Sequence, residues 1–350
     1  MLARESEGGS LIIEPPSELP APAPSVEGPI LAVENLHTWF EFGGGLFRKG
    51  GFVRAVDGVS FVLQRAETLA LVGESGCGKT TLGRTILRLV DPKEGRILYD
   101  GVDVAGFPEK KLRFMRRKAQ LIPQDPYSSL NPAYSIFRTL EEPLRVHGVH
   151  DSSARQERTA KALEDVKLVP PDLFLPKYPH MLSGGQRQRV SVARALILDP
   201  ELIVADEPVS MLDASVRISI LRLLESLQQK YRISFLYITH DLATARHFSN
   251  RIGIMYAGKI VEIAPSGDLL REPLHPYTKA LMDALPDPDP ENRLRERPIV
   301  PGEPPSLVSP PPGCSFHPRC PIAKAGLCDV VVPELRELRP THLVACHLAE

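Results

Sequence analysis

The sequence predicts an α/β fold in which helices cover both faces of a parallel sheet. Short apolar runs of strand length alternate with segments of helical spacing, at 68–72, 80–90, 153–168, 202–205, 215–231 and 235–239. In addition, the run at 68–72 leads directly into a glycine-rich loop and then into a helical pattern. Such alternation of apolar strands and helices is typical of a sheet that is covered on both faces.

Two strand-like segments, 31–36 and 59–63, precede this alternation, with a basic, glycine-rich loop or hairpin between them at 43–51. Proline lacks a backbone donor, so proline-dense zones should form neither helix nor central strand. Six prolines fall between Pro15 and Pro29, and ten fall between Pro286 and Pro312. We therefore expect a flexible proline-rich tail at 1–29, a main domain at 30–270, and an extension at 271–350 that joins a proline-rich linker to a cysteine-containing region.

The composition excludes several classes of protein. Of the 350 residues, 43% are hydrophobic, which is enough for a sizeable core, and the formal net charge of −1 gives no global attraction to nucleic acid or to an anionic membrane. No apolar stretch approaches the roughly 20 residues that span a bilayer, and the N-terminus lacks the pattern of a secretory signal. We expect a cytosolic protein whose membrane role, if it has one, depends on a partner.

The glycine-rich loop at 73–80 matches the phosphate-binding pattern G-x-x-x-x-G-K-[ST] in the expected strand–loop–helix context. Its glycines let backbone N–H groups turn toward phosphate oxygens, and the following helix adds its positive end. Lys79 supplies a charge for the β- and γ-phosphates, and Thr80 offers a hydroxyl to Mg²⁺. The alternative is a glycine-rich turn that arose by chance. The candidate nucleotide ligands are Gly73, Glu74, Ser75, Gly76, Cys77, Gly78, Lys79, Thr80 and Thr81.

Two acidic residues end the apolar strand at 202–205. In open α/β folds, ligands bind where the strands end. Asp206 can therefore hold Mg²⁺, directly or through water, and Glu207 is placed to polarise an attacking water. Taken alone, the pair could equally be a solvated acidic turn. Its occurrence in the same chain as the phosphate loop favours a role in the nucleotide site.

The segment 182–189, LSGGQRQR, lies just upstream of the Asp206 strand and resembles the signature of ABC ATPases. The resemblance covers about residues 30–285. It implies a P-loop cassette with a RecA-like core, an antiparallel β subdomain and a helical subdomain at about 125–195. In this family the signature closes on the ATP that is held by the opposite subunit. That role would fall to Ser183, Gly184, Gly185 and Gln186.

The same resemblance assigns further residues. Gln124 resembles the glutamine that senses Mg²⁺ and the attacking water, and His240 resembles the histidine that contacts the γ-phosphate, although a lone histidine after a strand is more often structural. Asp213 belongs to a loop that contacts the partner subunit, in which Met211 replaces the usual alanine. Phe40, next to Trp39, resembles the aromatic residue that stacks on adenine.

Three segments resemble the ATPases of oligopeptide and dipeptide importers: 124–132 (QDPYSSLNP), 82–89 (LGRTILRL) and 275–277 (HPY). This resemblance implies an ATP-hydrolysing subunit at the cytoplasmic face of the membrane, which acts on two separate permease subunits and, indirectly, on an extracytoplasmic solute-binding protein. Tyr127 and Leu130 should form part of the surface that receives the permease, unless they belong to the core.

The basic loop at 45–51 resembles that of the F-type subunit rather than the D-type, and the two types pair, which implies a heterodimer. The alternative class is a soluble ABC ATPase that acts on nucleic acid or as a regulator, but we expect no nucleic-acid partner. The transported solute is left open among peptide, oligosaccharide, nickel and glutathione.

Four of the five cysteines lie near the C-terminus, with the spacing C-x₅-C-x₇-C-x₁₇-C. Disulfides are disfavoured in the cytosol, and the spacing lacks the C-x₂-C pair that is usual for zinc. The region resembles the cysteine region of peptide-importer ATPases, some of which carry an iron–sulfur cluster, so the resemblance implies a [4Fe–4S] cluster. Zinc, aided by His317, His342 or His347, and free thiols are the alternatives. The implied ligands are Cys314, Cys320, Cys328 and Cys346.

Overall fold

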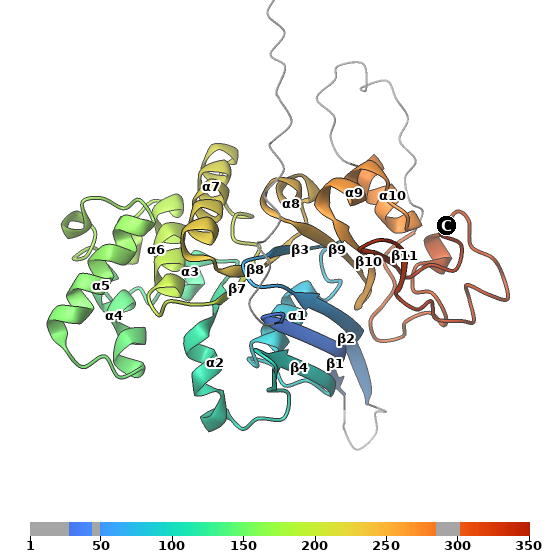
Figure 1. Cartoon of the computed structure of the whole chain (residues 1–350), viewed down its shortest axis with the longest axis horizontal. Helices are drawn as coiled ribbons and strands as arrows, with labels where there is room; N and C mark the ends of the chain where they lie inside the picture. Colours follow the sequence, from blue (N-terminus) through green and yellow to red (C-terminus); the bar gives the residue numbers. More distant parts are fainter. Residues whose placement is uncertain (1–27, 44–49, 285–301) are drawn as a thin grey trace, which may run out of the picture.

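The computed structural model describes residues 28–43, 50–284 and 302–350. The tail expected at 1–29 therefore lies outside the described residues except for its last two. Most of the glycine-rich loop at 43–51 and of the linker at 286–312 also lies outside them. Figure 1 shows the described part as a sheet-containing body with a group of helices at one end and the C-terminal segment at the other.

The main sheet has eight strands in the order β11-β12-β10-β9-β3-β8-β7-β6. The strands β6, β7, β8, β3 and β9 run parallel, and β10, β12 and β11 continue the sheet in antiparallel pairs. This arrangement confirms the predicted α/β fold. The bounds are β3 Thr68–Val72, β6 Ala119–Ile122, β7 Leu202–Asp206, β8 Ser234–Thr239, β9 Arg251–Tyr256, β10 Lys259–Pro265, β11 Arg336–Arg339 and β12 His342–Val344.

A second sheet is antiparallel throughout and has the order β2-β1-β4-β5. Its apolar side chains share one buried cluster with one face of the main sheet and with α1 (Lys79–Ile86). The hydroxyls of Thr38 and Thr85 are 3.0 Å apart and tie β1 to α1. The strands are β1 Leu31–Phe42, β2 Gly51–Leu63, β4 Glu94–Tyr99 and β5 Val102–Asp103.

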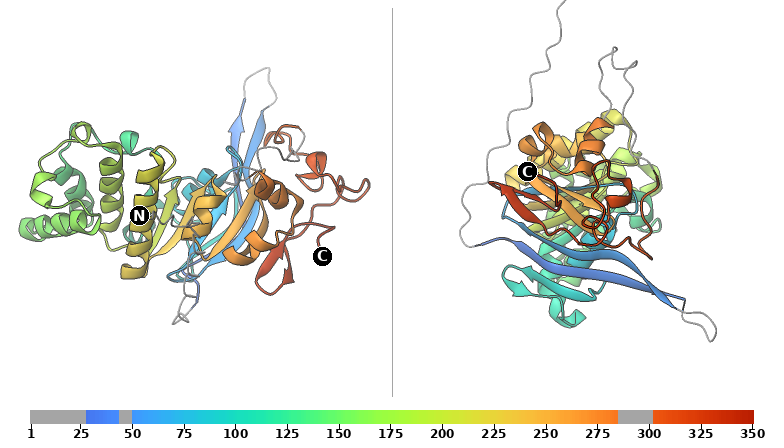
Figure 2. Two further views of the ribbon diagram at one scale, coloured as in Figure 1. Left: turned by 90° about the horizontal axis from the view of Figure 1, so that it is seen from above. Right: turned by 90° about the vertical axis from the view of Figure 1, so that its right-hand side faces the viewer.

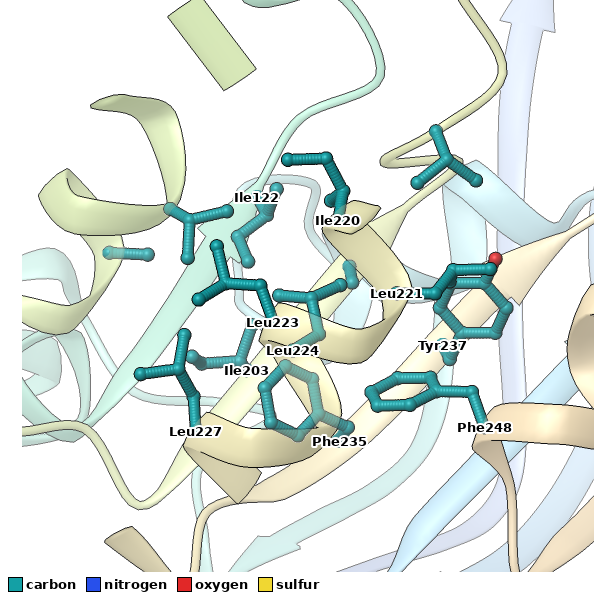
Figure 3. Close-up of a cluster of buried hydrophobic side chains, with 14 of the residues drawn as sticks. Ile122, Ile203, Ile220, Leu221, Leu223, Leu224, Leu227, Phe235, Tyr237 and Phe248 are labelled. Atoms are coloured by element: carbon teal, nitrogen blue, oxygen red, sulfur yellow. The ribbon is translucent and has the colours of Figure 1, made fainter. Parts of the chain in front are cut away.

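The opposite face of the main sheet is covered by α7 (Ala214–Tyr231) and α8 (Leu242–Phe248). In α7 the apolar side chains recur every three or four residues, which places them on one face of the helix. Figure 3 shows this face: Leu223, Leu224 and Leu227 of α7 pack over Ile203 of β7 and Phe235 of β8.

Four helices follow one another in the chain between 126 and 196 and form the lobe at one end of the molecule (Figures 1 and 2). They are α3 Pro126–Ser129, α4 Ile136–Val146, α5 Ser152–Asp165 and α6 Gly184–Leu196, and the short α2 (Arg113–Lys118) precedes them. Leu130 is only 2% exposed, so its expected place on the permease-facing surface is wrong: its side chain belongs to the core. Tyr127, in contrast, is 57% exposed.

The C-terminal region is joined to the edge of the main sheet. The strand β12 pairs with β10, and the buried carboxylate of Glu262 in β10 interacts with His342 Nε2 at 2.6 Å. The same carboxylate accepts the backbone N–H groups of Leu274 and His275, just before α10 (Pro276–Asp283). The helix α9 (Ser266–Arg271) lies between β10 and α10 in the chain. No helix among the described residues is both long and apolar enough to cross a membrane.

Candidate functional site

The phosphate loop joins β3 to α1 at the carboxyl end of β3. Two of its glycines, Gly76 and Gly78, have φ of +80° and +106°, values that side chains rarely adopt. At Gly78 a Cβ atom would lie 2.0 Å from the carbonyl oxygen of Ala55 in β2. Only glycine therefore fits at a point where the loop lies against the antiparallel sheet.

The ammonium group of Lys79 lies inside this loop and is almost fully buried. It donates to the carbonyl oxygens of Gly73 at 2.7 Å and of Glu74 at 2.8 Å. Burial raises the pKa of the Cys77 thiol, which is 3.6 Å from Lys79 Nζ. The loop thus holds the Lys79 ammonium group in place. The Cys77 thiol stays protonated and adds no charge to the phosphate site.

Thr80 and Asp206 meet across the ends of α1 and β7. The Thr80 hydroxyl donates to Asp206 Oδ1 at 2.8 Å. Burial raises the pKa of the Asp206 carboxyl, and the hydrogen bond from Thr80 opposes that rise. A buried carboxylate beside a hydroxyl suits a hard cation such as Mg²⁺, which prefers oxygen ligands. These two residues therefore fit the magnesium site that the sequence predicts.

A second group centres on the carboxylate of Glu207. Its Oε2 accepts from Gln124 Nε2 at 3.2 Å and is 3.1 Å from His240 Nδ1. Glu207 has φ of +44°, a strained value for a residue with a side chain, and its backbone N–H donates to Ile238 in β8. Three residues that are far apart in the sequence thus meet beside the Thr80–Asp206 pair. His240 is half exposed, so one side of the group faces solvent.

The signature lies at the N-terminus of α6. Ser183 and Gln186 form a capping box, in which the Ser183 hydroxyl accepts from the Gln186 N–H and the Gln186 side chain accepts from the Ser183 N–H. A Cβ atom at Gly185 would lie 2.7 Å from Val216 Cγ1, so α6 and α7 pack closely at this point. Asp213, at the N-terminus of α7, is exposed. The Asp213 loop and the signature are thus neighbours.

Phe40 lies two residues after Thr38 on β1, and the two therefore share the face of the sheet that is turned toward α1. Its ring is 42% exposed. Trp39 points to the other face, where the Arg54 guanidinium lies 5.0 Å from its ring centroid. Of the two aromatic residues, Phe40 has the more suitable position for a base that lies above the phosphate loop.

Two contacts at the phosphate loop were not anticipated from the sequence. The phenol oxygen of Tyr277 in α10 accepts from the Glu74 N–H at 3.2 Å. The Arg319 guanidinium lies 3.4 Å from Glu74 Oε1. Tyr277 belongs to the HPY segment, but nothing in its local pattern indicated a contact with a loop some 200 residues earlier in the chain.

The four C-terminal cysteines come close enough for their charges to interact. Burial raises the pKa of Cys314, the Phe316 N–H that bonds to its sulfur opposes the rise, and the other three cysteines add to it. Backbone N–H groups also reach the sulfurs of Cys320, Cys328 and Cys346. Within the described ranges, however, no three His, Cys, Asp or Glu side chains are already arranged to hold a metal ion.

Comparison with protein families gives two matches. Residues 56–210 match the family described as "ABC transporter", and residues 261–328 match "Oligopeptide/dipeptide transporter, C-terminal region". The first covers the chain from β2 to the residues after Glu207, and the second covers α9, α10 and three of the four cysteines. The first match thus contains most of the nucleotide site, and the second lies in the C-terminal part of the chain.

Curated relatives extend along nearly the whole chain. The chain is 47% identical over 322 residues to the oligopeptide transport ATP-binding protein AppF of Bacillus subtilis, with 91% of this chain and 97% of that protein covered. It is 48% identical to the putative oligopeptide transport ATP-binding protein YkfD of the same organism, with 91% and 95% covered. A putative peptide import ATP-binding protein of Brucella ovis is 46% identical, with 91% and 98% covered.

Solved structures with a similar fold are ATP-binding cassettes. The dimeric, post-hydrolysis structure of the cassette MJ0796 with ADP and Pi has a TM-score of 0.60 and 27% identity, and the match covers 67% of this chain and 98% of that one. CbiO1 of Clostridium perfringens, part of the ABC transporter complex CbiONQ, has a TM-score of 0.60 and 26% identity, with 70% and 92% covered.

Proposed function

We propose that this chain, which belongs to the family of ATP-binding subunits of oligopeptide and dipeptide ABC transporters, powers the import of peptides or related small solutes through separate membrane permease subunits. The chain is an ATPase whose activity is coupled to transport. The observation that carries the proposal is the meeting of Gln124, Glu207 and His240 beside the phosphate loop. The peptide importers among its relatives favour this function over a soluble ABC ATPase that acts on nucleic acid.

Phosphoryl transfer depends on positioning and on neutralising charge. Lys79 and the N-terminus of α1 bind the triphosphate, and Phe40 stacks on the base. Thr80, Gln124 and Asp206 would hold Mg²⁺, which neutralises phosphate charge when bound. Glu207 accepts a proton from the attacking water, with Gln124 and His240 fixing the direction of its carboxylate. His240 then contacts the γ-phosphate from its exposed side.

A single cassette leaves the outer side of this site open. The signature at Ser183–Gln186 would close on the ATP of a second ATPase subunit, and Asp213 would contact that subunit. The dimeric structure of the similar cassette MJ0796 supports closure by pairing. We propose a heterodimer in which this chain is the F-type member. Its unusual Met211 is 58% exposed beside the Asp213 loop, where a partner would cover it.

The helical lobe would receive the permease at the cytoplasmic face of the membrane. Tyr127 is exposed there and lies under the Arg187 guanidinium, which is 4.1 Å from its ring centroid. Arg187 is in α6, four residues after Ser183. Movement of a permease helix against Tyr127 would therefore be transmitted to the signature helix.

Cross-linking tests this assignment. A photoreactive phenylalanine analogue at Tyr127 should form an adduct with a permease subunit in the assembled, transport-active complex, because the side chain is exposed on the helical lobe. The same analogue at Val102, which is exposed on the antiparallel sheet, is the matched control and should form none. Absence of any Tyr127 adduct in an active complex would contradict the docking surface. ATPase stimulation by DNA, without any response to the permease, would favour the soluble alternative.

We further propose that Cys314, Cys320, Cys328 and Cys346 bind a [4Fe–4S] cluster. Backbone N–H groups point at all four sulfurs, and hydrogen bonds of this kind tune iron–sulfur ligands. One ring nitrogen of each nearby histidine is engaged: His317 Nδ1 with the Cys314 carbonyl, His342 Nε2 with Glu262, and His347 Nε2 with the Val331 carbonyl. Four sulfur donors are enough for iron–sulfur ligation without any histidine, and we expect a structural or sensing role for the cluster.

Chemical analysis after anaerobic purification tests the cluster. The full-length protein should be brown and should contain iron and acid-labile sulfide in equal amounts, because a [4Fe–4S] cluster has as many sulfides as irons. Cys320→Ser should remove most of the colour, and Cys77→Ser, a change at the fifth cysteine, should not. Stoichiometric zinc without sulfide would overturn the cluster and keep a four-cysteine metal site. If the protein contains no metal at all, the four cysteines are free thiols and the cluster proposal is wrong.

A further inference from the structure

The C-terminal region contacts the phosphate loop at Glu74. Arg319 Nη1 lies 3.4 and 3.5 Å from the two carboxylate oxygens of Glu74 and 3.3 Å from the Tyr256 hydroxyl. The Arg319 side chain is only 11% exposed. The Glu74 side chain is 30% exposed, so the ion pair is partly shielded from water, and such a pair is stronger than a fully exposed one. Glu74 is the second residue of the loop, so its charge lies next to the place where phosphates bind.

Tyr277 holds Glu74 through the Glu74 backbone N–H. Its phenol oxygen accepts from the Glu74 N–H at 3.2 Å, and its ring is buried against Tyr256 and Phe316, with centroids 4.5 and 5.5 Å away. His275 caps α10 by accepting from the Tyr277 N–H at 3.0 Å. The phenol is thus fixed in place by contacts within the protein.

We infer that Arg319 and Tyr277 are positioning residues for nucleotide binding, which they assist by holding Glu74 and with it the phosphate loop. A glycine-rich loop loses much backbone entropy when it becomes ordered around phosphates. Fixing one of its residues beforehand lowers that cost, as preorganisation does in other binding sites. Arg319 has a second effect, because it neutralises a carboxylate that would otherwise repel the triphosphate.

The same segment of chain also carries cysteines of the proposed cluster. Arg319 directly precedes Cys320, and Phe316, whose ring packs on Tyr277, lies two residues after Cys314. If residues 314–320 lose their fixed structure, both the Arg319 contact and the Tyr277 contact with Glu74 should weaken. ATP affinity depends in this way on a region that contributes no group to phosphoryl transfer. The inference rests on ATP binding at this loop, which belongs to the proposed function.

The test measures ATP binding by titration calorimetry with a non-hydrolysable ATP analogue and Mg²⁺, and also the steady-state KM and kcat, on the full chain. Tyr277→Phe removes only the hydroxyl and keeps the ring contacts. Arg319→Gln removes the charge. Each should weaken binding about three- to tenfold, the range expected for one lost hydrogen bond or shielded contact. KM should rise by a similar factor, and kcat at saturating ATP should stay near the wild-type value.

Two further variants separate positioning from a general structural effect. Arg339→Gln breaks an ion pair with Glu272 in the same C-terminal region, away from the loop, and should leave ATP affinity unchanged. In an Arg319→Gln background, Glu74→Gln should restore part of the lost affinity, because the unpaired negative charge is then gone. A merely destabilised fold would not be rescued in this way.

The outcomes are distinct. Failure of the wild-type chain to bind the analogue would count against the proposed function and not against this inference alone. Normal binding by wild type together with wild-type affinity in both single variants would overturn the inference. A fall in kcat with unchanged KM would do the same. Should Arg319→Gln fail to fold, Tyr277→Phe decides the result, because that change leaves the packing of α10 intact.

Discussion

Glu207→Gln is expected to lower ATP hydrolysis by about 10²-fold or more while ATP binding is kept, because general-base steps contribute roughly 10²–10⁴-fold. The amide has nearly the shape of the carboxylate and still reaches Gln124 and His240, which are 3.2 and 3.1 Å from Glu207 Oε2. It cannot accept a proton from water. The variant should therefore retain nucleotide and, with its partner subunit, accumulate in the ATP-bound, closed state.

Hydrolysis measured in the assembled complex, together with nucleotide binding by the same preparation, checks this result. Glu272→Gln changes the same kind of side chain at an exposed position outside the site and should behave as wild type. Normal turnover in the Glu207 variant would show that another group is the base. Lost nucleotide binding would instead indicate that the strained backbone at Glu207, with φ of +44°, depends on the carboxylate.

Local sequence patterns predicted the features that are determined within one segment of chain: single strands, single helices and the phosphate loop. The strand Thr68–Val72 and the helix Ala214–Tyr231 agree with the predicted segments to within a residue, because an uninterrupted apolar run and a repeat of three to four residues are unambiguous. The phosphate-loop motif likewise fixed the position of Lys79. The resemblance to ABC ATPases assigned Gln124 and His240, and the structure brings both together with Glu207.

Other features depend on contacts between distant segments and left no local signal. The strands β9 and β10 were not predicted, although both are largely buried, because Gly253 in β9 and Glu262 in β10 interrupt their apolar runs. Leu130 was placed on the surface, since an apolar residue in a short turn does not indicate which way it points. The contact between Arg319 and Glu74 joins residues 245 positions apart, and neither residue type is unusual in its own segment. The proposed subdomain limits and the pairing with a D-type subunit stay predictions.

Lys79→Ala is expected to weaken ATP binding by about 10²-fold, because a hydrogen bond to a charged group contributes roughly 1.5–3 kcal/mol and the lysine serves two phosphates. Its ammonium group donates to the carbonyl oxygens of Gly73 and Glu74 at 2.7 and 2.8 Å, so the loop itself holds this charge in place. Alanine loses both that charge and those two bonds, and the loop should become less ordered. Titration with the non-hydrolysable analogue measures the loss directly. Lys230→Ala, which removes a surface ion pair with Asp165 and a contact with the Tyr231 ring, is the control and should bind normally. Unchanged affinity in the Lys79 variant would contradict the placement of the triphosphate on this loop.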